Sequence, residues 1–304
     1  MKPHNFSLRQ LQYLIAVADT GRFRRAAELC HVSQPALSAQ LAQLESVLGF
    51  RVFERDRRRV LPTREGEELI ARARSLLTEA DDLIAAAAQL GDPLAGTVRL
   101  GVIPTIAPYA LPELAPAIRK KFPRLRLLWR EEKTDVLLRS LNAGALDGAL
   151  LALRSDVRPF EREVIAKDPF VLAATPGHPL ARKNRVRSEE LEGTTVLLLE
   201  DGHCFREQAL ALCLKLDAHE ADFRATSLAT LTQMVVGGAG VTLLPALSVP
   251  TENRAGALVV RSFAEPSPSR TIVLIWRPRS PAAGALRELA TVIRSAWPRN
   301  TRAH

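Results

Sequence analysis

The sequence predicts an α/β protein with three successive parts: a small helical head with a two-stranded wing, a long helix, and a two-lobed α/β region. Three observations support this prediction. Apolar residues recur at three- and four-residue spacing through residues 8–48 and again through 64–91. From residue 97 onward, apolar strands alternate with helical patterns, as crossover units of a parallel sheet do. The length of 304 residues allows more than one core.

Composition excludes several classes of protein. Hydrophobic residues make up 47% and charged residues 25% of the chain, which is ordinary for a globular protein. No apolar run approaches the roughly 18 residues of a membrane span, and the N-terminal segment lacks the apolar core of a signal peptide. We therefore expect a cytoplasmic protein with no membrane partner. Three cysteines do not form a structural disulfide framework.

Positive charge is concentrated near the N-terminus. Residues 1–62 carry ten Lys and Arg against five Asp and Glu, which accounts for +5 of the net charge of +9. Such a basic segment fits a polyanionic partner, most simply nucleic acid, although a solvated basic face would carry the same charge.

Three helices are expected in the head, over residues 8–18, 22–29 and 34–48. Ser33 is suited to cap the third helix, and Pro35 fits its first turn. The short connection between the second and third helices is typical of a helix-turn-helix.

The third helix and the segment after it carry the polar groups that such a motif offers to DNA. Gln34 and Ser38 lie on the outer face, where amides and hydroxyls can hydrogen-bond base edges. Two short strands then flank a turn rich in arginine, including Arg55 and Arg58, which is suited to contact phosphates or the minor groove. Residues 1–63 are therefore expected to form a winged helix-turn-helix.

A single long helix is expected over residues 64–91. Leucine recurs every seven residues from Leu69 to Leu90, with Ala73, Ala80 and Ala87 between. This heptad pattern predicts a homodimer seam, although the helix could instead pack on its own domain. Residues 64–92 are expected to be the linker and dimerisation helix.

Residues 93–304 are expected to form the two-lobed domain, with lobe I over 97–168 plus 271–304 and lobe II over 169–270. Two lobes of this size favour a small-ligand cleft between them. Because ligands of parallel sheets lie beyond the carboxyl ends of strands, Thr105, which follows the first strand, is a candidate contact.

Two cysteines lie nine positions apart in the stretch "EDGHCFREQALALC". The expected helix starts near His203 with Asp201 or Gly202 as its cap, so Cys204 lies in the first turn and Cys213 is buried deeper. Along a helix they would be about 13 Å apart on opposite faces, whereas a disulfide needs Cα atoms within about 7 Å. They are either two core thiols or a pair that joins only if the helix comes apart.

The helix N-terminus would favour a thiolate at Cys204, and His203 and Arg206 are nearby groups that could carry positive charge.

At the head, the stretch "RRAAELCHVSQPALSAQLAQLESVLGFRVFERDRRRVLPTREG" resembles the winged helix-turn-helix of LysR-type transcriptional regulators. The resemblance implies a C-terminal domain like a periplasmic binding protein. It also implies DNA contacts from the turn, the third helix and the wing, namely Ser33, Gln34, Pro35, Ser38, Arg55 and Arg58.

The cysteine segment, with "GVIPTIAPYALP" and "SRTIVLIWRP", resembles the OxyR-like, hydrogen-peroxide-sensing branch of that family. The resemblance implies that Cys204 is the peroxide-reactive thiol and Cys213 the resolving thiol. It further implies a peroxide pocket formed by Thr105, Thr134, His203 and Arg270. Cys30 is interpreted as a small packing residue outside the sensor.

The resemblance thus implies a DNA-binding regulator of the oxidative stress response that senses peroxide through a reversible Cys204–Cys213 disulfide. Its partners would be a double-stranded operator, a second copy of the chain in a homodimer and then a homotetramer, and RNA polymerase. It implies no enzyme activity, no cofactor and no metal. Two rival hypotheses are a LysR-type regulator gated by an organic effector in the lobe cleft, and a thiol peroxidase.

Overall fold

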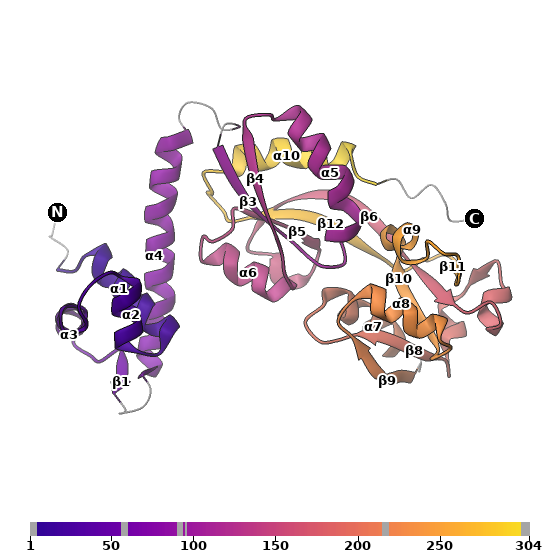
Figure 1. The fold of residues 1–304 in the computed structure, drawn as a ribbon, viewed down its shortest axis with the longest axis horizontal. Helices are drawn as coiled ribbons and strands as arrows, with labels where there is room; N and C mark the ends of the chain where they lie inside the picture. Colours follow the sequence, from indigo (N-terminus) through magenta and orange to yellow (C-terminus); the bar gives the residue numbers. More distant parts are fainter. Residues whose placement is uncertain (1–4, 56–59, 90–93, 95, 215–218, 299–304) are drawn as a thin grey trace. The chain divides into compact units, whose positions relative to one another are not determined.

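The computed structural model describes residues 5–55, 60–89, 94, 96–214 and 219–298 (Figure 1). Contacts divide the chain into two compact units. The first comprises residues 1–88 with 142–144, and the second comprises residues 89–141 with 145–304. Each unit has its own hydrophobic core, and the two are described separately.

The first unit begins with three short helices around a small core. They are α1 (Leu8–Thr20), α2 (Phe23–Leu29) and α3 (Gln34–Leu48). The Ser33 hydroxyl accepts a hydrogen bond from the backbone N–H of Ala36, and Pro35 occupies the first turn. The predicted helices and the predicted cap of α3 are thereby confirmed.

The wing and the long helix complete this unit. Strands β1 (Phe53–Arg55) and β2 (Val60–Pro62) pair in antiparallel fashion, and α4 spans Arg64–Gln89. The start of α4 contributes to the core of the head, where Ala73 is buried. Ala73 therefore packs within its own chain, where the heptad pattern predicts a seam position. Further along α4, Leu83 is 74% exposed.

The second unit is built on a sheet of ten strands among the described residues, with its main path in the order β4-β3-β5-β12-β6-β10-β8-β9. Lobe I contains β3 (Gly96–Val102), β4 (Leu125–Glu131) and β5 (Gly148–Ala152). Its helices are α5 (Ala107–Lys121), α6 (Thr134–Asn142) and α10 (Ala283–Ser295). Helices α5 and α10 pack together on one face of these strands, and α6 lies on the other (Figure 1).

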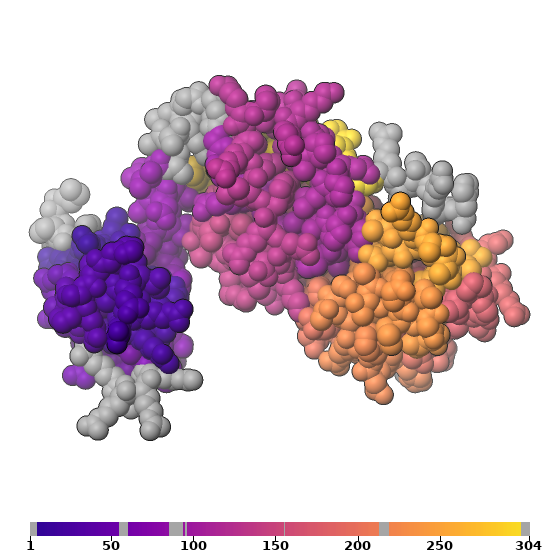
Figure 2. Space-filling view, in the orientation of Figure 1, coloured from indigo at the N-terminus to yellow at the C-terminus, as the bar shows by residue number. Residues whose placement is uncertain are grey.

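Lobe II contains the remaining shorter strands and the cysteine helix. Its strands are β7 (Arg185–Val186), β8 (Thr195–Leu199), β9 (His219–Ala225), β10 (Val241–Pro245) and β11 (Val259–Phe263). Its helices are α7 (Cys204–Leu214), α8 (Leu228–Val236) and the short α9 (Val249–Glu252). The lobes appear as two rounded bodies in the space-filling view, magenta for lobe I and mainly orange for lobe II (Figure 2).

Two long strands run from one lobe into the other. The first half of β6 (Glu161–Ala174) pairs with β12 (Ser269–Trp276), and its second half pairs with β10 and β11. The pairings of β6 with β12, β10 and β11 are all antiparallel, so the sheet is mixed, whereas alternating strands and helices predict a parallel sheet. The crossing places Arg270 opposite Asp168 in the ladder.

The strand pattern in the sequence misses β9, β11 and the first half of β6. β9 and the first half of β6 carry several charged residues and β11 carries one, and neighbouring strands supply the hydrogen-bond partners that make these segments strands. Among the described residues, no helix combines the length and the apolar character needed to span a membrane.

Candidate functional site

Cys204 is the first residue of α7, and its side chain is buried. The next residue, Phe205, packs edge-on against Phe170 of β6, with ring centroids 5.1 Å apart. Ala209, one turn further, is also fully enclosed. The thiol is therefore held at the N-terminal end of a helix that is packed against the crossing strand.

A buried arginine network lies beside this helix. The Arg270 guanidinium is 5.5 Å from the centroid of the Phe205 ring. Its Nε donates to the Asp168 carboxylate at 2.9 Å, and Nη1 donates to the Thr105 hydroxyl at 2.7 Å. Nη2 donates to the Thr105 carbonyl oxygen at 2.9 Å. Strand β12, strand β6 and the loop that follows β3 thus fix one cation in the interior.

Several buried polar atoms on and near this helix lack hydrogen-bond partners among the described residues, and two of them belong to residues expected in the peroxide pocket. These two are the Nε2 of His203 and the Oγ1 of Thr134, and both side chains are buried. A buried polar group without a partner is costly by about 1–3 kcal/mol, so such atoms often mark the place of a small polar ligand.

His203 is neutral near pH 7 in this state. Its burial, and secondarily the charge of Lys133, lower its pKa below the ordinary value, while Glu200 opposes the shift. The lowered pKa disfavours the positively charged form of His203 that the sequence suggested beside Cys204.

The side chain of Arg206 is committed to carboxylates. Its guanidinium donates to Asp201 at 2.9 Å and to Glu220 at 2.8 Å, and it also donates to the Leu199 carbonyl oxygen. These partners raise the pKa of Arg206, so the guanidinium stays charged, and their carboxylates balance its positive charge. Asp201, expected as a helix cap, uses its carboxylate to bind Arg206 and Arg224.

Cys213 lies near the end of the same helix, α7, and the two cysteines therefore share one helix in this structure. The side chain of Cys213 lies outside the described part of the structure, so its expected burial stays a prediction. Cys30 is half-buried against the core of the head, in agreement with its interpretation as a packing residue.

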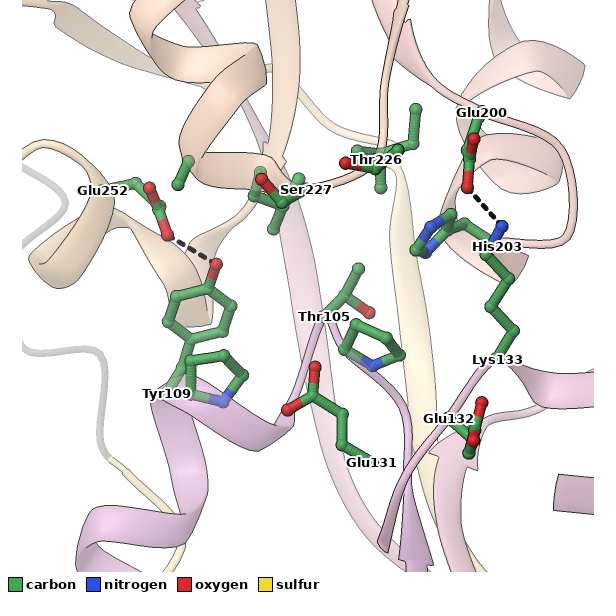
Figure 3. A pocket seen from close by; sticks show the side chains of 15 residues that line it. Thr105, Tyr109, Glu131, Glu132, Lys133, Glu200, His203, Thr226, Ser227 and Glu252 are labelled. Carbon is green, nitrogen blue, oxygen red and sulfur yellow. Dashed lines mark hydrogen bonds and ion pairs between the residues drawn. The ribbon is translucent and has the colours of Figure 1, made fainter. Parts of the chain in front are cut away.

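A cleft of about 470 Å³ separates the two lobes next to this site (Figure 3). Thr105 and His203 line it, so these two candidate pocket residues face common space. Tyr109 donates a hydrogen bond to Glu252 across the cleft at 2.6 Å, and Lys133 forms an ion pair with Glu200 on the opposite side. Arg270 and Thr134 are not among the lining residues.

The candidate DNA-contacting residues of the first unit lie at the start of α3. Gln34 and Pro35 are exposed, Ser33 caps the helix, and Ser38 is half-buried. The backbone of Arg55 belongs to β1, but its side chain lies outside the description, and Arg58 lies outside the described residues altogether. In the described part of the chain, no group of three or more His, Cys, Asp or Glu side chains could hold a metal ion.

Reasoning from the sequence missed Asp168, which anchors Arg270, and Phe205, whose ring faces it. No sequence signal separates Asp168 from other strand aspartates, because its partner is 102 positions away. An aromatic residue directly after the candidate thiol is a weak signal that could have drawn attention to Phe205.

Comparison with known proteins assigns the chain to a family. Residues 91–298 match the LysR substrate binding domain, and residues 8–67 match the bacterial regulatory helix-turn-helix protein domain of the lysR family. The chain therefore belongs to the LysR family of bacterial transcriptional regulators.

Within this family the chain resembles OxyR proteins. It is 43% identical over 289 residues to the hydrogen peroxide-inducible genes activator of Pectobacterium carotovorum subsp. carotovorum, covering 95% of this chain and 96% of that protein. It is 42% identical over 290 residues to the DNA-binding transcriptional dual regulator OxyR of Escherichia coli strain K12, covering 95% of each. The resemblance predicted from the cysteine segment is thus confirmed.

Solved structures give the same assignment. A full-length OxyR cysteine-to-aspartate variant from Pseudomonas aeruginosa superimposes with a TM-score of 0.76 at 35% identity, covering 97% of this chain and 96% of that one. A hydrogen-peroxide-bound OxyR cysteine variant from Corynebacterium glutamicum gives a TM-score of 0.66 at 32% identity, covering 97% and 94%. The predicted fold class is confirmed.

Proposed function

We propose that this chain is a cytoplasmic, DNA-binding regulator of the oxidative stress response that senses hydrogen peroxide through Cys204. One observation carries the proposal: a buried thiol begins a helix close to two buried polar atoms, on His203 and Thr134, that lack partners among the described residues. The names of its relatives, which include a hydrogen peroxide-inducible genes activator, support the same choice of signal.

Peroxide is small and neutral, and a few hydroxyl, imidazole and guanidinium groups suffice to orient it. We assign that role to Thr105, Thr134, His203 and Arg270. The Thr105 hydroxyl already accepts a hydrogen bond from Arg270, so its own proton is left to donate to a peroxide oxygen. The neutral imidazole of His203 can accept from peroxide or donate to it through Nε2, depending on its tautomer.

In the first step the Cys204 thiolate attacks one peroxide oxygen. The O–O bond breaks, an S–O bond forms, and the departing hydroxide takes up a proton to leave as water. Sulfur is oxidised to a sulfenic acid and peroxide is reduced. The charge of Arg270, fixed by Asp168, stabilises the hydroxide as it departs.

In the second step Cys213 attacks the sulfenic sulfur, a disulfide forms and a second water leaves. Because the two cysteines are nine positions apart, and so about 13 Å apart along the helix, α7 must unwind for this step. Unwinding of α7 is favoured because the buried Oε1 of Gln208 has no hydrogen-bond partner among the described residues, which destabilises the helix. Reduction by cytosolic thiols would restore the helix.

We assign DNA binding to residues 1–63, through Ser33, Gln34, Pro35 and Ser38 at the groove and Arg55 and Arg58 on the wing. Residues 64–92 would pair two chains, and Leu76, Leu83 and Ile84 offer exposed apolar surface for this. Residues 93–304 would sense peroxide and pass the change to the heads in a homotetramer that also contacts RNA polymerase. No catalytic turnover, metal or cofactor is part of this proposal.

A second candidate function rests on the cleft between the lobes, which is large enough for a small organic effector. In that case the cysteines are idle. A thiol peroxidase, the other alternative, would consume peroxide in repeated turnover with a reductase.

The deciding experiment is to count free thiols by mass spectrometry before and after one equivalent of hydrogen peroxide. The proposal predicts a Cys204–Cys213 disulfide within seconds, reversed by dithiothreitol, with Cys30 unchanged. Retention of all three thiols would contradict it and favour the organic effector. Sustained peroxide consumption with a thiol reductase would instead indicate an enzyme.

A further inference from the structure

Two cations of lobe I contact the lobe II segment that carries Cys204. Lys133, directly after the β4 edge of lobe I, forms an ion pair with Glu200 and donates to the Asp201 carbonyl oxygen at 3.1 Å. Arg154, which follows β5, places its Nη1 3.2 Å from the Glu207 carboxylate. These contacts lie before and after Cys204 in the sequence, so lobe I holds the segment from both sides.

The two contacts differ in kind. The aliphatic part of Lys133 packs against Gly202: a Cβ added at Gly202 would lie 3.2 Å from the Cδ of Lys133. The Lys133 ammonium group contacts both the Glu200 carboxylate and the Asp201 carbonyl oxygen. Arg154 Nη1 lies near Glu207 but makes no hydrogen bond among the described residues. The first contact fixes the loop that precedes the helix, and the second is an ion pair without hydrogen-bond geometry.

Glu207 also belongs to the part of the molecule that must move. It lies in the first turn of α7, between the two cysteines in the chain, and the proposed disulfide requires α7 to unwind. Arg154 stays with lobe I, where it also pairs with Asp156 at 3.0 Å. Unwinding therefore separates Glu207 from Arg154, while the Lys133 contacts lie outside the unwinding segment.

We propose that the ion pair between Arg154 and Glu207 is a positioning contact that exists only in the reduced state and sets how easily the disulfide forms. This inference rests on the proposed peroxide-sensing function. Neither residue belongs to the peroxide pocket, so the pair acts on the conformation of α7 and not on the reaction of Cys204 with peroxide.

The test measures the dithiol–disulfide equilibrium of the full chain in dithiothreitol redox buffers, with trapped thiols counted by mass spectrometry. Glu207→Gln should shift the equilibrium toward the disulfide by about two- to fivefold, the effect expected of a partly exposed ion pair. Arg154→Gln should shift it in the same direction, and the double variant should shift it no further than the larger single effect. Glu288→Gln, at an exposed position on α10, is the matched control and should match the unsubstituted chain.

Three further readouts separate positioning from a general structural role. Glu207→Asp should bring the dithiol–disulfide equilibrium part of the way back to that of the unsubstituted chain. Added salt should shift the equilibrium of the unsubstituted chain toward the disulfide but leave that of Glu207→Gln unchanged. The rate of sulfenic acid formation should be the same in Glu207→Gln as in the unsubstituted chain. Equal equilibria for Glu207→Gln and the unsubstituted chain would overturn the inference. Failure of the unsubstituted chain to form the disulfide would overturn the proposed function itself, so the two failures are distinguishable.

Discussion

At the scale of single residues, the arrangement around Arg270 explains how a cation can be kept in a protein interior, next to the helix that begins with Cys204. Its guanidinium is 1% exposed and pairs with Asp168, which is itself buried and also accepts from the backbone N–H of Leu247. Burying a charge is tolerated when it is paired and hydrogen-bonded, and this pair meets both conditions.

Asp168→Asn is expected to lower the free energy of unfolding by about 3 kcal/mol, because it leaves a buried guanidinium without its counterion. It should also slow peroxide oxidation of Cys204, since Arg270 loses its anchor. Denaturant unfolding and stopped-flow oxidation measure the two effects. The control is Glu163→Gln, which removes a half-exposed pair with Arg294 and should change stability by less than about 1 kcal/mol. Equal losses in the two variants would contradict the role assigned to Asp168.

The imidazole of His203 predicts a pH dependence of stability. Its pKa in the folded chain lies below the ordinary value of 6.5, so the unfolded chain binds more protons as the pH falls below 6.5. The contribution of neutral His203 to the free energy of unfolding is fully present above pH 6.5, and it is lost as the pH falls through the pKa of His203 in the folded chain.

Unfolding midpoints measured from pH 8 to pH 5 should therefore show a smaller loss of stability in His203→Gln than in the unsubstituted chain. The exposed His219 supplies the control, His219→Gln, which should keep the original slope. An unchanged slope in His203→Gln would mean that this histidine does not titrate as proposed.

At the scale of elements, α7 combines strong contacts at its start with a defect in its middle. Phe205 and Ala209 are buried, and Arg206 forms an ion pair with Glu220. By contrast, the side-chain oxygen of Gln208 is buried without a hydrogen-bond partner among the described residues. Because the middle of α7 is destabilised while its start is well packed, we expect α7 to unwind at a low cost in free energy.

Gln208→Leu should stabilise the reduced chain by about 1 kcal/mol, because it removes a buried polar atom without a partner. It should also slow disulfide formation several-fold without changing the rate at which sulfenic acid appears. Mass spectrometry of quenched time points resolves the two steps. Ala211→Ser, at an exposed position of the same helix, should leave both steps as they are. If Gln208→Leu accelerates the disulfide step, the defect in α7 does not assist unwinding.

At the scale of the whole molecule, the proposed homodimer rests on the long helix α4. Leu83 is 74% exposed and Ile84 is 70% exposed, which is unusual for aliphatic residues in a regular heptad pattern unless a second chain covers them.

If α4 pairs two chains as proposed, Leu83→Glu should convert the dimer into monomers at micromolar concentration. The unfolding free energy of the head should change by less than about 0.5 kcal/mol, as for an exposed substitution. Sedimentation velocity measures the mass. The matched control is Ala71→Glu, an exposed position off the heptad seam, which should remain a dimer. A dimer that survives Leu83→Glu would show that α4 is not the pairing surface.

The sequence alone was sufficient for the parts whose signals are local. The Ser33 cap, the long helix α4 and the strands of lobe I depend on spacing along the chain, and the structure confirms these elements, whereas the heptad seam on α4 stays a prediction. The cysteine segment likewise indicates the OxyR-like branch from the sequence alone. Tertiary structure decided the rest. In the folded chain Asp168 binds Arg270, which is 102 positions away, and burial lowers the pKa of His203. Arg206 pairs with carboxylates, and Ala73 packs in the core of the head. The physical reason is that charge, burial and hydrogen bonding depend on neighbours in space, and the crossing strands β6 and β12 determine those neighbours.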